Sequence, residues 1–226
     1  MPNQHENHHR EIIKHISQVS GNIPTHRKAS KHSYSFSQQS FAEQLSIWNH
    51  AWNHSPHFRV KLHAFFFLEQ HMKRKETLEQ MWPVIIQWQD SVDDWPLCDS
   101  LSKIYTRILE LFPARMYKIA KAWNSDADLW KRRQSIVSLL YYSRTKKSYL
   151  PFDKIEKLLS SLLKDKEYYV QKGVGWTLRE MYTVYPEETS PYFVKHIKSI
   201  SSIAFTIAIE KMNAHKKVQL KALRKK

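Results

Sequence analysis

Residues 170–181 read VQKGVGWTLREM and show the pattern that decides the fold. Val170, Val174 and Leu178 recur at helical spacing, which predicts one buried face of an amphipathic helix. With only 3 glycines in 226 residues, the chain has little material for tight hairpins. The sequence therefore predicts an all-α protein. Four further segments repeat the apolar spacing: Leu45, Trp48 and Trp52; Leu101, Ile104, Ile108 and Phe112; Ile136, Leu139 and Leu140; and Ile155, Leu158, Leu159 and Leu162.

Short breaks separate these apolar segments, which predicts helices of about 10 to 18 residues with brief connections. Helix pairs recurring at roughly 35 to 45 residues favour an α-solenoid or superhelix of antiparallel HEAT-like helix pairs over a four-helix bundle. We expect its concave face to be basic. The breaks are a polar turn at residues 124–128 and six proline sites: Ser55-Pro56, Trp95-Pro96, Phe112-Pro113, Leu150-Pro151, Tyr185-Pro186 and Ser190-Pro191.

The net charge of +15 makes a polyanion the expected partner, with an anionic membrane surface as the competing one. No apolar run approaches the roughly 20 residues that span a bilayer, and residues 1–10 lack the apolar core of a signal peptide. A location in the cytoplasm of a bacterial-type cell, at the nucleoid, is therefore expected, without membrane association. The single cysteine, Cys98, cannot form an internal disulfide and reads as a packing residue rather than a nucleophile.

Composition divides the chain into three predicted parts. Residues 1–33 are polar and carry six of the thirteen histidines, with one helix expected around Ile12 and Ile16. Residues 34–212 form the helical repeat domain, and residues 213–226 form a basic tail, either frayed or acting as an electrostatic arm. No metal site or cofactor is predicted, because no acid or thiolate accompanies the histidines in a known pattern. The histidines at metal-like spacing are His5, His8, His9, His50, His54 and His57.

Residues 93–100, DDWPLCDS, contain the first candidate site. Trp95 and Asp99 lie four residues apart, so on a helix they point to the same side. A carboxylate beside an aromatic face suits the stabilisation of a cation. The alternative is helix capping by Asp93 or Asp94, with Asp99 favoured in the first turn by the helix dipole.

Residues 128–134, DLWKRRQ, contain the second candidate site. Three consecutive cations, Lys131, Arg132 and Arg133, lie in the first turn of an expected helix. Cations there oppose the helix dipole and need an anionic partner. Phosphate is one candidate partner, and an ion pair with Asp126 or Asp128 is the other.

The third candidate site lies on the segment quoted first. Lys172, Trp176 and Arg179 share one helix face, whereas Gly173 and Gly175 lie beside it. Glycine weakens a helix interior by about 0.5 to 1 kcal/mol, so two glycines indicate the close approach of another backbone, either a neighbouring helix or a ligand. Ordinary core packing of Trp176 is the alternative to a binding role.

These three sites together resemble the AlkD-like family of DNA alkylation repair glycosylases, in the family's order and close to its spacing. The resemblance covers roughly residues 40–200 and is carried by residues 95–100 (WPLCDS), 129–133 (LWKRR) and 170–180 (VQKGVGWTLRE). It implies a solenoid of HEAT-like repeats and a monomer that acts on double-stranded DNA with alkylated bases. Residues 203–209, IAFTIAI, depart from the basic stretch usual near the family's C-terminus, so a DNA contact is expected to be missing there.

The resemblance also implies roles for individual residues. Asp99 falls on the catalytic acid, and Trp95 and Trp176 on the residues that hold the lesion. Three functions are then open: excision of cationic N3- or N7-alkylated purines, non-catalytic binding of damaged or branched DNA, and a helical scaffold for proteins or anionic lipid. The predicted phosphate-binding cations are Arg133 and Arg179, together with Lys172, Arg132 and Lys131.

Overall fold

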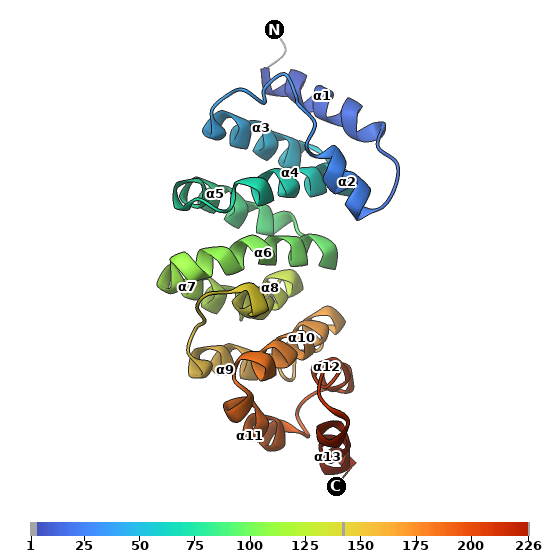
Figure 1. Cartoon of the computed structure of the whole chain (residues 1–226), viewed down its shortest axis with the longest axis vertical. Helices are drawn as coiled ribbons and strands as arrows, with labels where there is room; N and C mark the ends of the chain where they lie inside the picture. Colours follow the sequence, from blue (N-terminus) through green and yellow to red (C-terminus); the bar gives the residue numbers. More distant parts are fainter. Residues whose placement is uncertain (1–3, 142, 226) are drawn as a thin grey trace. The chain divides into compact units, whose positions relative to one another are not determined.

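The computed structural model describes residues 4–141 and 143–225 (Figure 1). Thirteen α-helices and two short 3-10 helices, with no strand, make up the regular structure of these residues, which confirms the all-α prediction. The contacts divide the chain into two compact units, Met1–Val92 and Asp93–Lys226. This boundary differs from those predicted at residues 33 and 212, because both terminal segments fold as helices that pack within a unit.

The first unit is built around α3, which packs against α1, α4 and α5. The apolar face predicted around Ile12 and Ile16 is buried on α1, so the histidine-rich segment belongs to the core of this unit. Trp52 and Trp88 stack with ring centroids 4.1 Å apart. The helices of the unit are α1 (Gln4–Ser17), α2 (Ile23–Ala29), α3 (Phe41–His54), α4 (Phe58–His71) and α5 (Lys75–Trp88), followed by the 3-10 helix Gln89–Ser91.

The second unit is a succession of helix pairs. Its helices α6, α8, α10 and α12 pack each on the next, and Figure 1 shows α7, α9 and α11 as the partners that connect them. This arrangement agrees with the predicted HEAT-like pairs of a solenoid. The bounds are α6 (Trp95–Leu111), α7 (Pro113–Trp123), α8 (Leu129–Leu140), α9 (Phe152–Ser161), α10 (Tyr168–Val184), α11 (Pro186–His196), α12 (Ser202–Ala208) and α13 (Ala214–Lys225), with a 3-10 helix at Ser143–Thr145.

The two glycines of α10 mark its closest neighbours. A Cβ atom at Gly173 would lie 3.3 Å from the Cγ atom of Arg133 on α8. A Cβ atom at Gly175 would lie only 2.5 Å from the carbonyl oxygen of Ala204 on α12. The predicted close approach of a backbone is therefore confirmed at Gly175, where the neighbour is α12, whereas Gly173 faces side chains of α8.

Two expectations about the C-terminal third need correction. Pro191 does not end a helix but lies inside α11. The basic segment after Met212 is not a frayed tail, since α13 buries Leu220. The Nη1 atom of Arg224 anchors α13 by donating to the carbonyl oxygens of Ile197 and Ile200 at 2.8 and 2.7 Å.

None of the helices in the described part of the chain combines the length and the apolar character needed to cross a bilayer. The departing stretch of residues 203–209 lies mostly in α12, which packs against α10. Of its hydrophobic side chains, Ala204, Phe205, Ala208 and Ile209 are buried, whereas Ile203 is exposed.

Candidate functional site

An ion pair at the junction of α6, α8 and α10 forms the centre of the candidate site. The Nη2 atom of Arg133 donates to the Oδ1 atom of Asp99 at 2.7 Å, and its Nη1 atom donates to the carbonyl oxygen of Tyr169 at 2.8 Å. Arg133 is only 6% exposed, whereas the Asp99 side chain is 24% exposed. The buried guanidinium thus holds in place a carboxylate that still reaches solvent.

The start of α6 explains why Asp99 is available for this pair. The Oδ1 atom of Asp94 caps the helix by accepting from the backbone nitrogen of Leu97 at 2.8 Å, and Pro96 lies in the first turn. The capping role therefore belongs to Asp94, and Asp99 lies one turn further along. Trp95, the first residue of α6, is 50% exposed, so its ring is accessible to a ligand.

Buried polar side chains of α6 and α8 form hydrogen bonds next to the ion pair. The thiol of Cys98 donates to the Oε1 atom of Gln134 at 3.0 Å, and the Nε2 atom of Gln134 donates to Ser102 at 2.7 Å. Burial raises the pKa of the Cys98 thiol to about 12, so it is protonated near neutral pH and is not a nucleophile. Burial by itself lowers the pKa of Arg133, but the Asp99 carboxylate that accepts its hydrogen bond contributes to raising that pKa. The guanidinium therefore stays charged.

The cations at the start of α8 face carboxylates of the chain itself. Lys131 lies 3.8 Å from Asp126, and the Nε atom of Arg132 donates to Asp165 at 2.7 Å. The ion pair with Asp126 was the predicted alternative to phosphate, but Asp165 and Asp99 were not predicted as partners. Phosphate binding by these cations stays a prediction, and it requires them to exchange partners. Arg133 is the cation least able to exchange its partner for a phosphate, because its side chain is buried.

The third predicted group lies on α10 and lines a different hollow. The ring of Trp176 packs against Tyr141 at a centroid distance of 5.3 Å, and the Nη1 atom of Arg179 donates to Glu210 at 2.6 Å. Both line a cavity of about 240 Å³ whose lining does not include Trp95 or Asp99. Lys172 lies over the rings of Tyr168 and Tyr169, at 5.4 and 5.9 Å. The structure thus brings Asp99 and Arg133 together and places Trp176 and Arg179 at a neighbouring position on α10.

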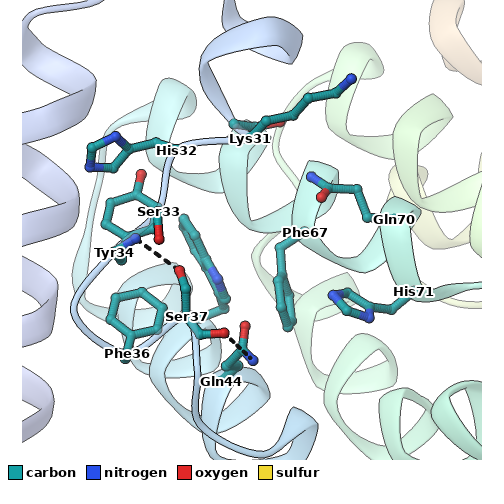
Figure 2. Close-up of a pocket in the computed structure, with 12 residues that line it drawn as sticks. Lys31, His32, Ser33, Tyr34, Phe36, Ser37, Gln44, Phe67, Gln70 and His71 are labelled. Carbon is teal, nitrogen blue, oxygen red and sulfur yellow. Dashed lines mark hydrogen bonds between the residues drawn. The ribbon is translucent and has the colours of Figure 1, made fainter.

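Sequence reasoning missed two features of the first unit. One is an aromatic pocket of about 270 Å³ lined by Tyr34, Phe36 and Phe67 (Figure 2). Ser37 closes one side of it by accepting from the backbone nitrogen of Tyr34 at 2.8 Å. The aromatic and serine residues of residues 33–41 were the available signal. The other is the place of Glu6 beside His9 and His50, two histidines that the sequence had singled out, with the potential metal ligands of the three residues within 4.8 Å of one another.

The sequence of this chain matches the model of a protein family, and its fold is similar to that of several solved structures. A family model described as DNA alkylation repair enzyme matches residues 3–212. AlkD2 from Streptococcus mutans is similar with 18% sequence identity and a TM-score of 0.64, over 93% of this chain and 100% of that chain. A predicted DNA alkylation repair enzyme from Enterococcus faecalis has 15% identity and a TM-score of 0.67, over 92% and 96%.

A third solved structure, smu.31 from Streptococcus mutans UA159, has 16% identity and a TM-score of 0.58, over 96% of this chain and 98% of that one. No curated protein matches the chain. At such identities the solved structures establish the common helical fold, whereas the family model establishes the relationship by sequence.

Proposed function

We infer that this chain, which belongs to the family of DNA alkylation repair enzymes, is a DNA glycosylase that acts on cationic N3- or N7-alkylated purines in double-stranded DNA. 3-Methyladenine and 7-methylguanine are the simplest such bases. The observation that carries this proposal is the Asp99 carboxylate, which Arg133 fixes at 2.7 Å while leaving it partly exposed. The exposed ring of Trp95 lies one turn away on the same helix.

The chemistry of the lesion fits such a carboxylate. Alkylation of a ring nitrogen gives the purine a positive charge and weakens its bond to the sugar. As the base departs with the bonding electrons, the sugar becomes an oxocarbenium-like cation. A preorganised carboxylate stabilises this cation, and a water molecule then adds to the sugar carbon and loses a proton. Asp99 would supply the carboxylate, Arg133 would position it, and Trp95 would stack on the cationic base.

Binding to the DNA backbone would draw on the cations of α8 and α10. Arg179 can exchange its exposed partner Glu210 for a phosphate, although its own side chain is only 14% exposed and also lies 3.5 Å from Glu180. Lys131 is held more loosely, since 3.8 Å separates it from Asp126. Lys172 adds charge on the same helix as Arg179. Arg133 instead acts through Asp99, and Trp176 would flank the lesion from α10.

Replacement of Asp99 tests the proposal. In Asp99→Asn, excision of 7-methylguanine from a duplex should fall by on the order of 10²- to 10³-fold, the loss found when one preorganised electrostatic group is removed. Excision is measured by cleaving the resulting abasic sites and separating the strands on a gel. Asp93→Asn, which changes an exposed carboxylate just before α6, serves as the matched control and should retain full activity. Unchanged excision in Asp99→Asn would refute the assignment.

A second function is favoured by the same ion pair. Because Arg133 already compensates the charge of Asp99, the chain could recognise damaged or branched DNA without excising a base. In that case the wild type binds such DNA with strong salt dependence but leaves no abasic sites, and Asp99→Asn binds equally well. The excision assay on wild-type protein therefore distinguishes the two functions.

A further inference from the structure

Two helices of the first unit bring together side chains that are far apart in the sequence. Glu6 and His9 lie three residues apart on α1, so they project from one side of that helix. His50 lies on α3, which packs against α1 (Figure 1). One potential ligand atom from each of these three residues lies within 4.8 Å of the other two. The sequence showed no acid with these histidines in a known metal-binding pattern, and the packing of α1 on α3 places Glu6 beside them.

His9 is buried and His50 is half-buried, and each has a buried ring nitrogen without a hydrogen-bond partner. His9 is only 6% exposed, and its Nε2 atom has no hydrogen-bond partner. The Nε2 atom of His50 is buried too and makes no hydrogen bond, although the Glu6 carboxylate faces it at 3.7 Å. A buried polar atom without a partner is unfavourable and calls for an explanation. Both histidines belong to the group that includes the Glu6 carboxylate, so a single cation held between the three residues would give the imidazoles a partner.

Neighbouring histidine rings pack around this group. His5 and His54 stack on His50 with centroid distances of 5.6 and 4.0 Å, and the ring of His9 lies edge-on to that of His50 at 5.6 Å.

We propose that Glu6, His9 and His50 form a binding site for a divalent metal ion of the Zn²⁺ type, which fastens α1 to α3. Two imidazole nitrogens and one carboxylate oxygen suit Zn²⁺, which also accepts a water molecule as its fourth ligand.

One pair in the group is close to the spacing of a metal site, and the three ligand atoms lie within 4.8 Å of one another. The Nε2 atom of His50 lies 3.7 Å from the Oε2 atom of Glu6, whereas tetrahedral bonds of about 2.0 to 2.1 Å place two ligand atoms about 3.4 Å apart. The other oxygen of Glu6, Oε1, lies 3.5 Å from Arg10. One carboxylate oxygen is therefore left for the metal.

Metal binding by the whole chain tests this site. Full-length protein is freed of metal with a chelator and titrated with ZnCl2 in a calorimeter, and its unfolding temperature is measured with and without Zn²⁺. One Zn²⁺ per chain should bind with micromolar or tighter affinity and raise the unfolding temperature, because it binds only the folded state. Glu6→Gln and His50→Gln should weaken binding at least about tenfold, the effect found even for removal of an outer-shell partner.

His215→Gln is the matched control, since His215 is an exposed histidine of the second unit. It should bind Zn²⁺ like the wild type. Glu6→Gln changes a side chain that is 42% exposed, so it keeps the fold even if His50→Gln does not. Two results would overturn the site: no stoichiometric Zn²⁺ binding by the wild type, or equal affinity of the wild type and Glu6→Gln. Neither result depends on excision activity.

Discussion

At the scale of the residue, the pair of Asp99 and Arg133 couples the candidate chemistry to the stability of the second unit. Arg133 is almost fully buried, and besides Asp99 it satisfies the carbonyl oxygen of Tyr169. Burying a charge is costly unless it is paired. The site therefore depends on a contact that also holds α6, α8 and α10 in register.

Arg133→Met should lower the free energy of unfolding by about 3 kcal/mol, near the lower end of the range for breaking a buried pair because Asp99 is partly exposed. The double variant Arg133→Met with Asp99→Asn should regain part of this loss, since no unpaired charge remains. Urea unfolding of all variants measures both effects. Lys131→Met, which removes a looser pair at 3.8 Å, is the control and should cost less than about 1 kcal/mol. If the losses in unfolding free energy of the two single variants simply add up in the double variant, Arg133 and Asp99 are not energetically coupled.

Single residues also show where sequence reasoning reaches its limit. The spacing of Trp95 and Asp99 predicted a shared side of one helix, and an acid at the helix start predicted the cap that Asp94 provides. Both are local features. The partners of Arg132 and Arg133 were beyond reach, because Asp165 and Tyr169 lie 33 and 36 residues away in the sequence. They become neighbours only when α8 and α10 pack.

At the scale of the element, the two glycines of α10 predict different outcomes for the same substitution. Gly175→Ala would bring Cβ within 2.5 Å of the carbonyl oxygen of Ala204. Overpacking against a backbone costs about 1 to 3 kcal/mol, so α12 should loosen. Gly173→Ala meets mainly the side chains of Arg133 and Val137 at 3.3 Å. These can shift slightly, and the gain of about 1 kcal/mol in helix propensity offsets the strain.

Thermal and urea unfolding should therefore rank Gly175→Ala well below the wild type and Gly173→Ala close to it. Hydrogen exchange within α12 would locate the loss. Because Gly173 lies against Arg133, Gly173→Ala should still slow excision by displacing the partner of Asp99. Equal stability of the two variants would show that α12 does not depend on the close approach at Gly175.

Helices were predictable to the extent that their apolar spacing was regular. The predicted faces around Leu101, Val174 and Ile155 are buried except for the half-buried Phe112, and Pro113 and Pro186 begin helices α7 and α11. The basic segment that forms α13 gave a weak pattern, since within that helix only Leu220 is buried. Its place comes from tertiary contacts of Arg224, which composition does not reveal.

At the scale of the whole molecule, the histidines are unevenly distributed between the two units. Eleven of the thirteen histidines precede Val92 and so belong to the first unit. His63 is fully buried there, and its Nε2 atom lies 3.0 Å from the Nδ1 atom of His26. Burial, reinforced by His26 and His15, lowers the pKa of His63 to about 4. The two units should therefore respond differently to acid.

Acidification should weaken the first unit before the second. Between pH 6.5, the ordinary pKa of histidine, and pH 4, His63 is protonated in the unfolded chain but stays neutral in the folded protein. The free energy of unfolding therefore decreases as the pH is lowered through this window, by at most about 3 kcal/mol from His63 alone. Below pH 4 this contribution changes no further. Hydrogen exchange, corrected for its intrinsic pH dependence, should show protection lost in residues 4–92 at pH 5 but kept in α6, α8 and α10. His63→Gln should flatten this dependence and His215→Gln should not, whereas simultaneous loss in both units would contradict an origin in the buried histidines.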